Sequence, residues 1–140
     1  MEEHFVGKVG QKAIIEQGGK VLLVRSSEDE NKWELPGGRL NMKESPIEGL
    51  KRELLEELNI EIEVHNLVYT EQSLHTQKGE WSLFLIYSAS VTNSETTFTP
   101  AIDGEIVEIK WIDKDQLYDW DIFETYRRGL EVYFKKSTAT

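Results

Sequence analysis

The sequence predicts an α/β fold, an α/β/α sandwich in which helices cover both faces of a central mixed β-sheet. The order of elements predicts it: extended stretches come first, then an amphipathic helix, then further extended stretches and a closing helix. The length of 140 residues is that of one ordinary domain, so we expect residues 1–140 to form a single domain. Apolar residues make up 39% of the chain and alternate with polar ones, which excludes a collagen-like or wholly disordered chain.

A β-hairpin is predicted at the N-terminal end. Residues 6–17 alternate loosely and are rich in Val and Ile, and residues 20–25 are mostly apolar. The Gly18–Gly19 pair between these stretches suits a tight turn, because glycine adopts the required backbone angles without strain. The two stretches are therefore expected to pair as neighbouring strands.

The segment that follows the hairpin is predicted to be mainly loop. Residues 26–32 are polar and charged, which indicates a surface loop. Residues 33–36 form a short expected strand, which ends at its proline. The Gly37–Gly38 pair then predicts a flexible turn.

The first helix carries the clearest local signals. Ser45 is a suitable N-cap, Pro46 fits the first helical position, and Glu48 completes a capping box with Ser45. Asn59 suits the left-handed position that follows a helix ending near Leu58. One apolar stripe at spacings of three and four is expected to face the core: Ile47, Leu50, Leu54 and Leu58.

The second half of the chain returns to extended structure. Residues 60–73 read as a strand, and residues 81–92 form a strongly apolar strand expected in the interior of the sheet. Residues 92–104 are a polar loop, and the alternation over 106–112 predicts one more strand.

A second helix is expected to close the chain. Asp113 is a candidate cap for a short turn through Leu117, and Asp121 with Glu124 forms a capping pattern for a helix that runs to about Lys135. The apolar residues expected to pack on the sheet are Ile122, Phe123, Tyr126, Leu130 and Phe134.

Charge and composition exclude several classes of function. Sixteen basic against twenty-six acidic residues give a net charge of −10, so we expect no binding to long nucleic acid and none to anionic membranes. The longest apolar run, residues 83–87, is too short to span a membrane, and the acidic N-terminus is not expected to be a signal peptide. The absence of cysteine excludes disulfides and thiolate metal sites, and it fits the cytoplasmic location that we expect. A small polyphosphate could still bind if divalent cations reversed the local charge.

Three carboxylates share one face of the first helix, beside its apolar stripe. Glu53, Glu56 and Glu57 stand at positions i, i+3 and i+4. Each like-charged i,i+4 pair opposes the helix by roughly 0.2–0.5 kcal/mol, and the helix dipole disfavours acids in this half. A solvated acidic face is the simpler interpretation. Clustered carboxylate oxygens are also what Mg²⁺ or Mn²⁺ prefers, and the preceding Gly-Gly turn and capped helix favour this second interpretation.

The segment 38–60 carries a set of residues at fixed spacing: Gly38, Glu44, Arg52, Glu53, Leu54, Glu56, Glu57 and Ile60. This pattern resembles the Nudix box, a signature of fixed glycine, glutamate and arginine positions. Asn59 stands where the family has glycine, a substitution that the left-handed conformation tolerates. The lead-in at 33–38 and the late strand at 105–112 also resemble the family.

The resemblance implies a Mg²⁺-dependent enzyme, with Mn²⁺ a substitute, that hydrolyses the pyrophosphate linkage of a nucleoside diphosphate derivative. It implies Glu53, Glu56 and Glu57 as metal ligands, with the Gly37 carbonyl as a further one. The catalytic base is expected to be Glu53 or, as in some members, a loop glutamate, here Glu105. Asp103 and Glu108 are weaker candidates for this base.

The remaining basic residues have expected roles as well. Arg52 can reach Glu48 and Glu56 at i±4, and the resemblance implies that it bridges to Glu44 and braces the loop before the helix. Arg25 and Arg39 are candidates for contact with substrate phosphate, although a solvated arginine at a strand end is the simpler interpretation of both. We expect the three histidines to be ordinary surface or strand residues.

The resemblance leaves the substrate open between nucleoside triphosphates (including oxidised forms), ADP-ribose or another nucleotide sugar, and dinucleoside polyphosphates. Residues 75–78 lack the proline or tyrosine that marks some of these specificities. A non-catalytic nucleotide-sensing module of the same fold is the alternative, although the box acids are all present. A third hypothesis is an acidic protein-interaction domain whose helix matches by coincidence. The intact spacing of the box residues disfavours it. Members of the family are often dimers, so the resemblance leaves a homodimer as one possible oligomeric state.

Overall fold

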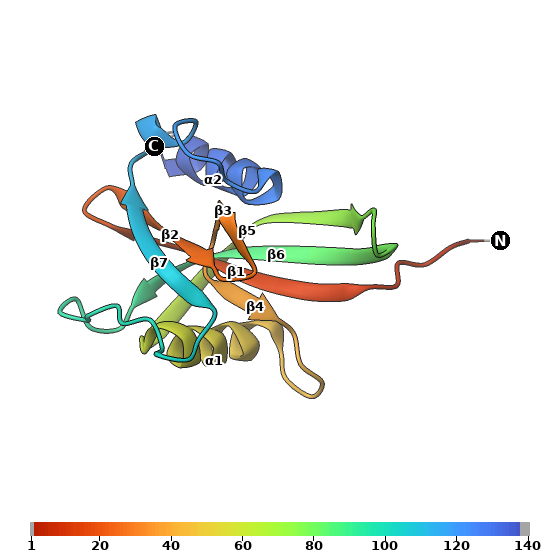
Figure 1. The fold of residues 1–140 in the computed structure, drawn as a ribbon, viewed down its shortest axis with the longest axis horizontal. Helices are drawn as coiled ribbons and strands as arrows, with labels where there is room; N and C mark the ends of the chain where they lie inside the picture. The colour runs from red at the N-terminus through yellow and green to blue at the C-terminus, as the bar shows by residue number, and fades with distance from the viewer. Residues whose placement is uncertain (1, 138–140) are drawn as a thin grey trace.

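The computed structural model describes residues 2–137, which form a mixed β-sheet between two helices (Figure 1). Helix α1 lies on one face of the sheet and helix α2 on the other, which confirms the predicted sandwich. No helix in this part of the chain is long and apolar enough to cross a membrane. The elements are β1 (Lys8–Gln17), β2 (Lys20–Ser26), β3 (Asp29–Glu34), β4 (Gly37–Arg39), α1 (Pro46–Leu58), β5 (Ile62–His75), β6 (Glu80–Val91), β7 (Ile106–Ile112), the 3₁₀ turn η1 (Lys114–Gln116) and α2 (Glu124–Ser137).

The seven-stranded sheet has the order β3-β2-β1-β6-β5, with β4 paired to β1 and β7 paired to β2. Strands β1 and β6 run parallel, while the other strand pairs are antiparallel, so the sheet is mixed as predicted. Strand β6 has a neighbour on each side, which confirms its interior position. The β1–β2 hairpin is also confirmed, and Gly18 and Gly19 turn the chain at φ 58° and 79°.

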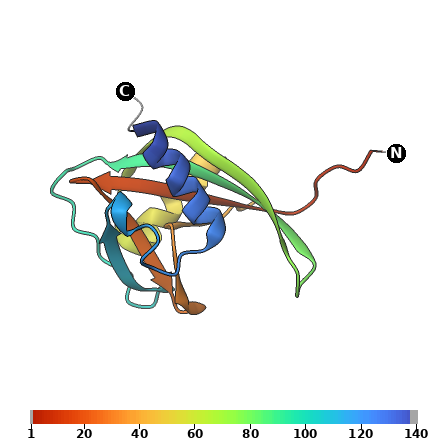
Figure 2. The same cartoon turned by 90° about the horizontal axis from the view of Figure 1, so that it is seen from above.

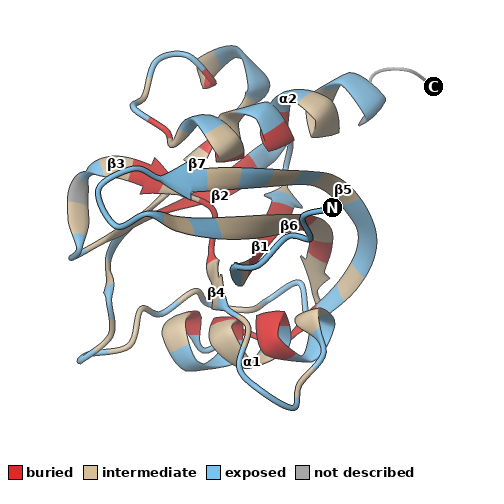
Figure 3. Ribbon diagram, turned by 90° about the vertical axis from the view of Figure 1, so that its right-hand side faces the viewer, coloured by how far each residue is buried: buried red, intermediate tan, exposed pale blue. Residues whose placement is uncertain are grey.

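Strand β1 separates two cores through the alternation of its side chains. Ile14 belongs to the core beneath α2, which includes Tyr126 and Leu130 of that helix. Ala13 and Ile15 belong to the core beneath α1, which includes Leu50, Leu54 and Leu58. Figure 3 shows the buried positions gathered on the sheet and on the inward faces of both helices.

Helix α1 begins and ends as its local sequence predicts. The backbone N–H of Glu48 donates to the Ser45 hydroxyl at 3.2 Å, and Pro46 occupies the start of the helix. Asn59 adopts φ 56° and ψ 41°, the left-handed conformation expected after the last turn. Ile47 departs from the predicted stripe, because its side chain is 41% exposed on the first turn.

Two segments predicted as loop or turn are strands. Residues 29–32, predicted as loop, join the predicted strand residues Trp33 and Glu34 in β3, which pairs with β2, with Arg25 opposite Trp33. Leu35 and Pro36, also predicted as strand, lie outside it. Strand β3 lies at the edge of the sheet, where polar residues are common, and it is mostly polar. Its sequence therefore predicts a loop. Gly37 and Gly38 lie in β4 instead of a flexible turn, opposite Lys12 and Gln11 of β1.

Helix α2 begins at Glu124, later than the predicted cap at Asp121. The carbonyl of Asp121 accepts the N–H of Trp33 at 2.8 Å, and Ile122 forms an isolated bridge with Trp33. The backbone at 121–122 pairs with Trp33, and the helix begins only at Glu124, so Asp121 does not occupy its N-cap position. Asp113 does cap the 3₁₀ turn at 114–116, as predicted. The five apolar residues predicted to pack on the sheet all do so: Ile122, Phe123, Tyr126, Leu130 and Phe134.

Candidate active site

A cavity of about 880 Å³ is lined by segments that are far apart in the sequence. The first four strands, helix α1, the tip of the β5–β6 hairpin, the loop before β7 and the start of α2 all contribute side chains. Seen from above, the β5–β6 hairpin projects past the helices (Figure 2). The volume falls in the range of small-molecule sites, and the mixture of acids and bases in the lining suits a charged ligand.

The acidic end of the cavity is formed by Glu53, Glu56 and Glu57 of α1 together with Glu105 of the loop before β7. The carboxylate of Glu53 rests on the backbone of Gly38, where a Cβ atom would lie 2.4 Å from its carboxyl carbon. A side chain at position 38 would therefore displace Glu53. The four acids come from two distant segments, which the fold brings to one wall.

Burial raises the pKa of both Glu53 and Glu57. For Glu53 the nearby Arg52 opposes this effect, whereas the charge of Glu56 adds to it. For Glu57 the charges of Glu105 and Glu53 raise the pKa further. One oxygen of Glu57, Oε2, is buried and has no hydrogen-bond partner within residues 2–137. This end of the cavity therefore concentrates negative charge that the described protein groups only partly neutralise.

Arg52 braces the loop before α1. Its guanidinium donates two hydrogen bonds to Glu44, at 2.8 and 3.0 Å, and the N–H of Asn41 donates to the same carboxylate at 3.0 Å. These contacts lower the pKa of Glu44 to about 2, with Arg52 as the largest cause. Arg52 also contacts Glu53 at 3.1 Å and Glu56 at 3.2 Å. It thus holds two of the site carboxylates as well as the loop.

Among the described residues, no three acidic or histidine side chains are already gathered closely enough to form a metal cage. One nitrogen of Arg52, Nη1, contacts both Glu53 and Glu56, so part of the charge of these two carboxylates is balanced within the chain. Gly37 lines the cavity beside them, and its φ of 148° and the carbonyl of Gln11 leave no room for a side chain there.

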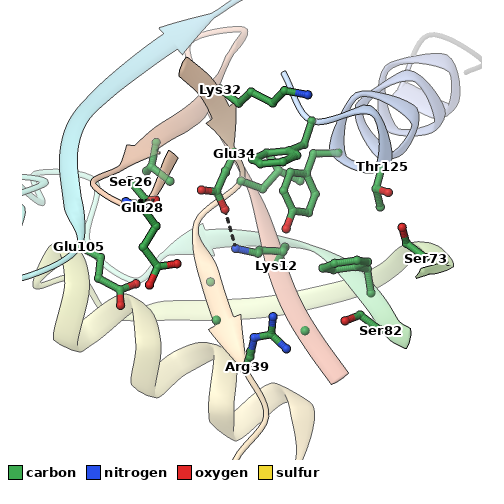
Figure 4. Close-up of a pocket in the computed structure, with 18 of the residues that line it drawn as sticks. Lys12, Ser26, Glu28, Lys32, Glu34, Arg39, Ser73, Ser82, Glu105 and Thr125 are labelled. Carbon is green, nitrogen blue, oxygen red and sulfur yellow. Dashed lines mark hydrogen bonds and ion pairs between the residues drawn. The ribbon is translucent and has the colours of Figure 1, made fainter. Parts of the chain in front are cut away.

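The two candidate phosphate-binding arginines lie in different places. Arg39 lines the cavity, where Figure 4 shows it below Lys12. Arg25 pairs with Glu108 at 2.7 Å and lies over the ring of Trp33. Neither Arg25 nor Glu108 is among the described residues that line the cavity, and the same holds for Asp103. The structure therefore brings Arg39 and Glu105 to the cavity and leaves these three outside it.

Sequence reasoning missed the part of the cavity on the α2 side. Lys12 of β1 and Glu34 of β3 form a largely buried ion pair there, with 11% and 18% of their side chains exposed. Burial opposes the charged form of Lys12, but Tyr126 and Glu34 hold its pKa above the ordinary value. Burial also raises the pKa of Tyr126, so its phenol is neutral at pH 7 and Glu34 keeps Lys12 protonated. The signal was a lone charge within the otherwise uncharged residues 9–15.

The tip of the β5–β6 hairpin and the first turn of α2 were also missed. They add Ser73, His75, Lys78, Ser82 and Thr125 to the cavity wall. His75 was predicted to be an ordinary strand or surface residue, and it lies at the end of β5 within this wall. No local pattern marks these residues, because their place depends on how far the hairpin reaches over the sheet.

Comparison with known proteins identifies the class to which this fold and acidic helix belong. The family model of the NUDIX domain matches residues 9–132. The chain therefore belongs to the Nudix family of hydrolases, whose members act on nucleoside diphosphate derivatives.

Particular relatives agree with this assignment. A MutT-like protein of Streptomyces ambofaciens is 39% identical over 81% of this chain and 67% of its own length. An 8-oxo-dGDP phosphatase of Danio rerio is 31% identical over 91% of this chain, which spans only 38% of that protein. A Nudix hydrolase of Nitrosomonas europaea has the same fold, with a TM-score of 0.78 and 24% identity over 94% of this chain and 90% of its own.

Proposed function

We propose that this chain hydrolyses the pyrophosphate linkage of a nucleoside diphosphate derivative with the help of Mg²⁺. The observation that carries the proposal is the arrangement of the cavity. Glu53, Glu56, Glu57 and Glu105 form one end, while Lys12 and Arg39 lie further along the same cavity. A diphosphate ester needs divalent cations to approach such an acidic wall, and basic side chains beyond it suit the rest of an anionic ligand.

The donors at the acidic end fit Mg²⁺. They are carboxylate and carbonyl oxygens, the ligands that hard divalent cations prefer. The buried Oε2 of Glu57 has no described hydrogen-bond partner, and Gly38 provides the space that Glu53 occupies. Glu53, Glu56, Glu57 and the Gly37 carbonyl would hold the ion, and Mn²⁺ would be a substitute. Mg²⁺, when bound there, would neutralise phosphate charge and make a bound water more acidic.

The protein groups supply the remaining chemistry. Arg39 lines the cavity and would orient a phosphate group through charge-assisted hydrogen bonds. Either Glu53 or Glu105 would accept the proton of the attacking water. The two differ in their surroundings, because Glu53 is half-buried and contacts Arg52, whereas Glu105 is exposed on its loop. Arg52 and Glu44 would keep the loop and the helix in register.

The Danio rerio relative is an 8-oxo-dGDP phosphatase, which supports a purine nucleoside di- or triphosphate as the substrate of this chain. Because this chain spans only part of that protein, the substrate is a proposal for direct testing. A panel of nucleoside di- and triphosphates, their 8-oxo forms, ADP-ribose and dinucleoside polyphosphates, with Mg²⁺ and with Mn²⁺, covers the alternatives.

The decisive experiment measures release of phosphate or pyrophosphate from this panel by wild type and Glu57→Gln. Wild type is expected to turn over with Mg²⁺ and to stop when the metal is chelated. Glu57→Gln is expected to lose activity by two or more orders of magnitude, because it removes a charged oxygen ligand. Glu16→Gln, on β1 and outside this cavity, is the matched control. Equal activity of Glu57→Gln and wild type would refute the proposal, and binding without turnover would indicate a sensing module. Hydrolysis in isotopically labelled water would locate the phosphorus that is attacked.

A further inference from the structure

The Lys12–Glu34 ion pair lies on the α2 side of the cavity, where Lys12 is still near enough to Glu53 for its charge to oppose the effect of burial on the pKa of that carboxyl. Lys12 reaches over the strands towards Glu34, with Arg39 on one side and Thr125 on the other (Figure 4). The pair is largely buried, yet Nζ of Lys12 lies 3.5 Å from Oε1 of Glu34, which is long for a charge-assisted hydrogen bond. A buried pair at this distance keeps Lys12 charged but adds little stability compared with apolar residues of similar volume. The pair is therefore better explained by a ligand than by stability.

Unused hydrogen-bonding capacity at the pair supports a ligand. An ammonium group has three donors, and a carboxylate can accept about four hydrogen bonds. Lys12 approaches one oxygen of Glu34 and also hydrogen-bonds with the Tyr126 side chain, which leaves one of its donors and the other Glu34 oxygen for a ligand; both Lys12 and Glu34 line the cavity. The pair thus offers a ligand in the cavity the Lys12 ammonium as a donor beside the Glu34 carboxylate as an acceptor, in a fixed order.

Aromatic side chains form the walls next to the pair. Phe84 of β6 and Tyr126 of α2 meet edge to face, with ring centroids 5.7 Å apart, and both line the cavity. Gly10 leaves room for the Phe84 ring, since a Cβ atom there would lie 3.1 Å from it. The ring of Tyr126 lies 5.2 Å from Nζ of Lys12. A flat aromatic ligand that stacks or packs on these rings would present its polar edge to the ion pair.

Strand pairing links this region to the acidic end. Lys12 stands opposite Gly37 in the β1–β4 pairing, and Gly38, the next residue, supports the carboxylate of Glu53. Arg39 follows directly on the same strand and also lines the cavity. One ligand can therefore span both regions, with its phosphates at the carboxylates and its ring at the ion pair.

We propose that Lys12 and Glu34 select guanine as the base of the nucleotide substrate. Lys12 would donate to the O6 carbonyl, and the Glu34 carboxylate would accept from N1–H and the N2 amino group. Adenine presents a donor and an acceptor in the opposite order, and so does cytosine, while uracil offers Glu34 only one N–H. Oxidation at C8 leaves this edge of guanine unchanged, so 8-oxoguanine nucleotides belong to the same class. This inference rests on the proposed function for the position of the phosphates.

The first test measures kcat/KM for GTP, ATP, CTP and UTP with Mg²⁺. Wild type is expected to prefer GTP over ATP at least tenfold. Glu34→Gln is expected to lower kcat/KM for GTP about 10- to 100-fold, the range of a lost bidentate base contact, and to change ATP by less than about threefold. Glu16→Gln is the control, because it removes a hydrogen-bonded carboxylate outside this cavity. An equal loss for all four bases in Glu34→Gln would overturn the inference while leaving hydrolysis established.

The second test separates the inference from the proposed function. Calorimetric binding of GMP and AMP without metal requires no catalysis. Wild type is expected to bind GMP more tightly than AMP, and Glu34→Gln is expected to bind them equally. Equal affinities in wild type would overturn the inference even if nucleotides were hydrolysed. A preference for GMP in a protein that hydrolyses no nucleotide would instead refute the proposed function. If circular dichroism shows that Glu34→Gln is unfolded, Lys12→Arg and Glu34→Asp keep the charges, and both are expected to weaken GMP binding through altered reach.

Discussion

The carboxylate of Glu71 joins strand β5 to helix α2, and its removal should destabilise the protein in a pH-dependent way. Two nitrogens of Arg128 donate to it at 2.7 Å each, and the hydroxyls of Tyr69 and Thr125 donate at 2.7 and 2.5 Å. These contacts, Arg128 first, lower the pKa of Glu71 from 4.5 to about 2. We therefore expect Glu71→Gln to be less stable than wild type at pH 7.

The magnitude follows from the shift in pKa. A lowering of this size corresponds to about 3 kcal/mol if the interaction were fully shielded from water. The side chain of Arg128 is 46% exposed, so solvent screening reduces the effect. We expect Glu71→Gln to lower the free energy of unfolding by about 1–2 kcal/mol at pH 7, or the midpoint temperature by about 3–6 °C.

The sign of the pH dependence distinguishes this ion pair from simple packing. Because the folded pKa lies below the unfolded one, the stabilisation is present above about pH 4.5 and is lost as pH falls towards 2. Urea unfolding followed by tryptophan fluorescence at pH 7, 5 and 3.5 measures the difference between the two proteins. The difference is expected to shrink as pH falls. A difference that stays constant over this range would refute the reasoning, and Arg128→Met should reproduce the loss at pH 7.

Two further substitutions test the geometry of the acidic end. Gly38→Ala is expected to keep the fold but lower turnover tenfold or more, because its Cβ atom would lie 2.4 Å from the carboxyl carbon of Glu53 and displace that carboxylate. Steady-state kinetics measures turnover and a thermal melt measures stability. Unchanged turnover would contradict the described position of Glu53. Asn59→Gly is expected to leave catalysis nearly unchanged and to alter the free energy of unfolding by less than about 1 kcal/mol, because residue 59 already has φ 56°, a conformation that glycine adopts freely. Measured kcat and a thermal melt test this. A large change in kcat would show that this helix end does more than terminate α1.

Helix α1 could be predicted from sequence because its signals are local. Ser45 and Pro46 mark its start, Asn59 marks its end, and the apolar spacing between them identifies its buried side. The three acids of this helix follow from the same periodicity. Interactions within four residues are enough to describe all of these features, so no knowledge of the rest of the chain was needed.

Other features depend on contacts between distant segments. Strand β3 is mostly polar, so its sequence carries no pattern typical of a strand. It is a strand because its backbone pairs with β2. A Gly-Gly pair by itself predicts a turn. Only the fold shows that Gly37 lies against the backbone of Gln11 and Gly38 against the carboxylate of Glu53, which leaves no room for side chains. Lys12 and Glu34 are 22 positions apart and meet only once the sheet is formed. The one local sign of this pair was Lys12 itself, a lone charge within the otherwise uncharged residues 9–15.

The alternation along strand β1 makes its length critical. Gln11 is fully buried on the α1 side, close to Gly49 and the Glu44 carboxylate, whereas the next residue, Lys12, faces the cavity on the other side of the sheet. Insertion or deletion of a single residue ahead of this point would exchange the two faces and place the charge in the wrong layer. We therefore expect this chain to tolerate a change in the length of the β5–β6 tip, which forms part of the cavity wall, better than a change in the spacing of β1.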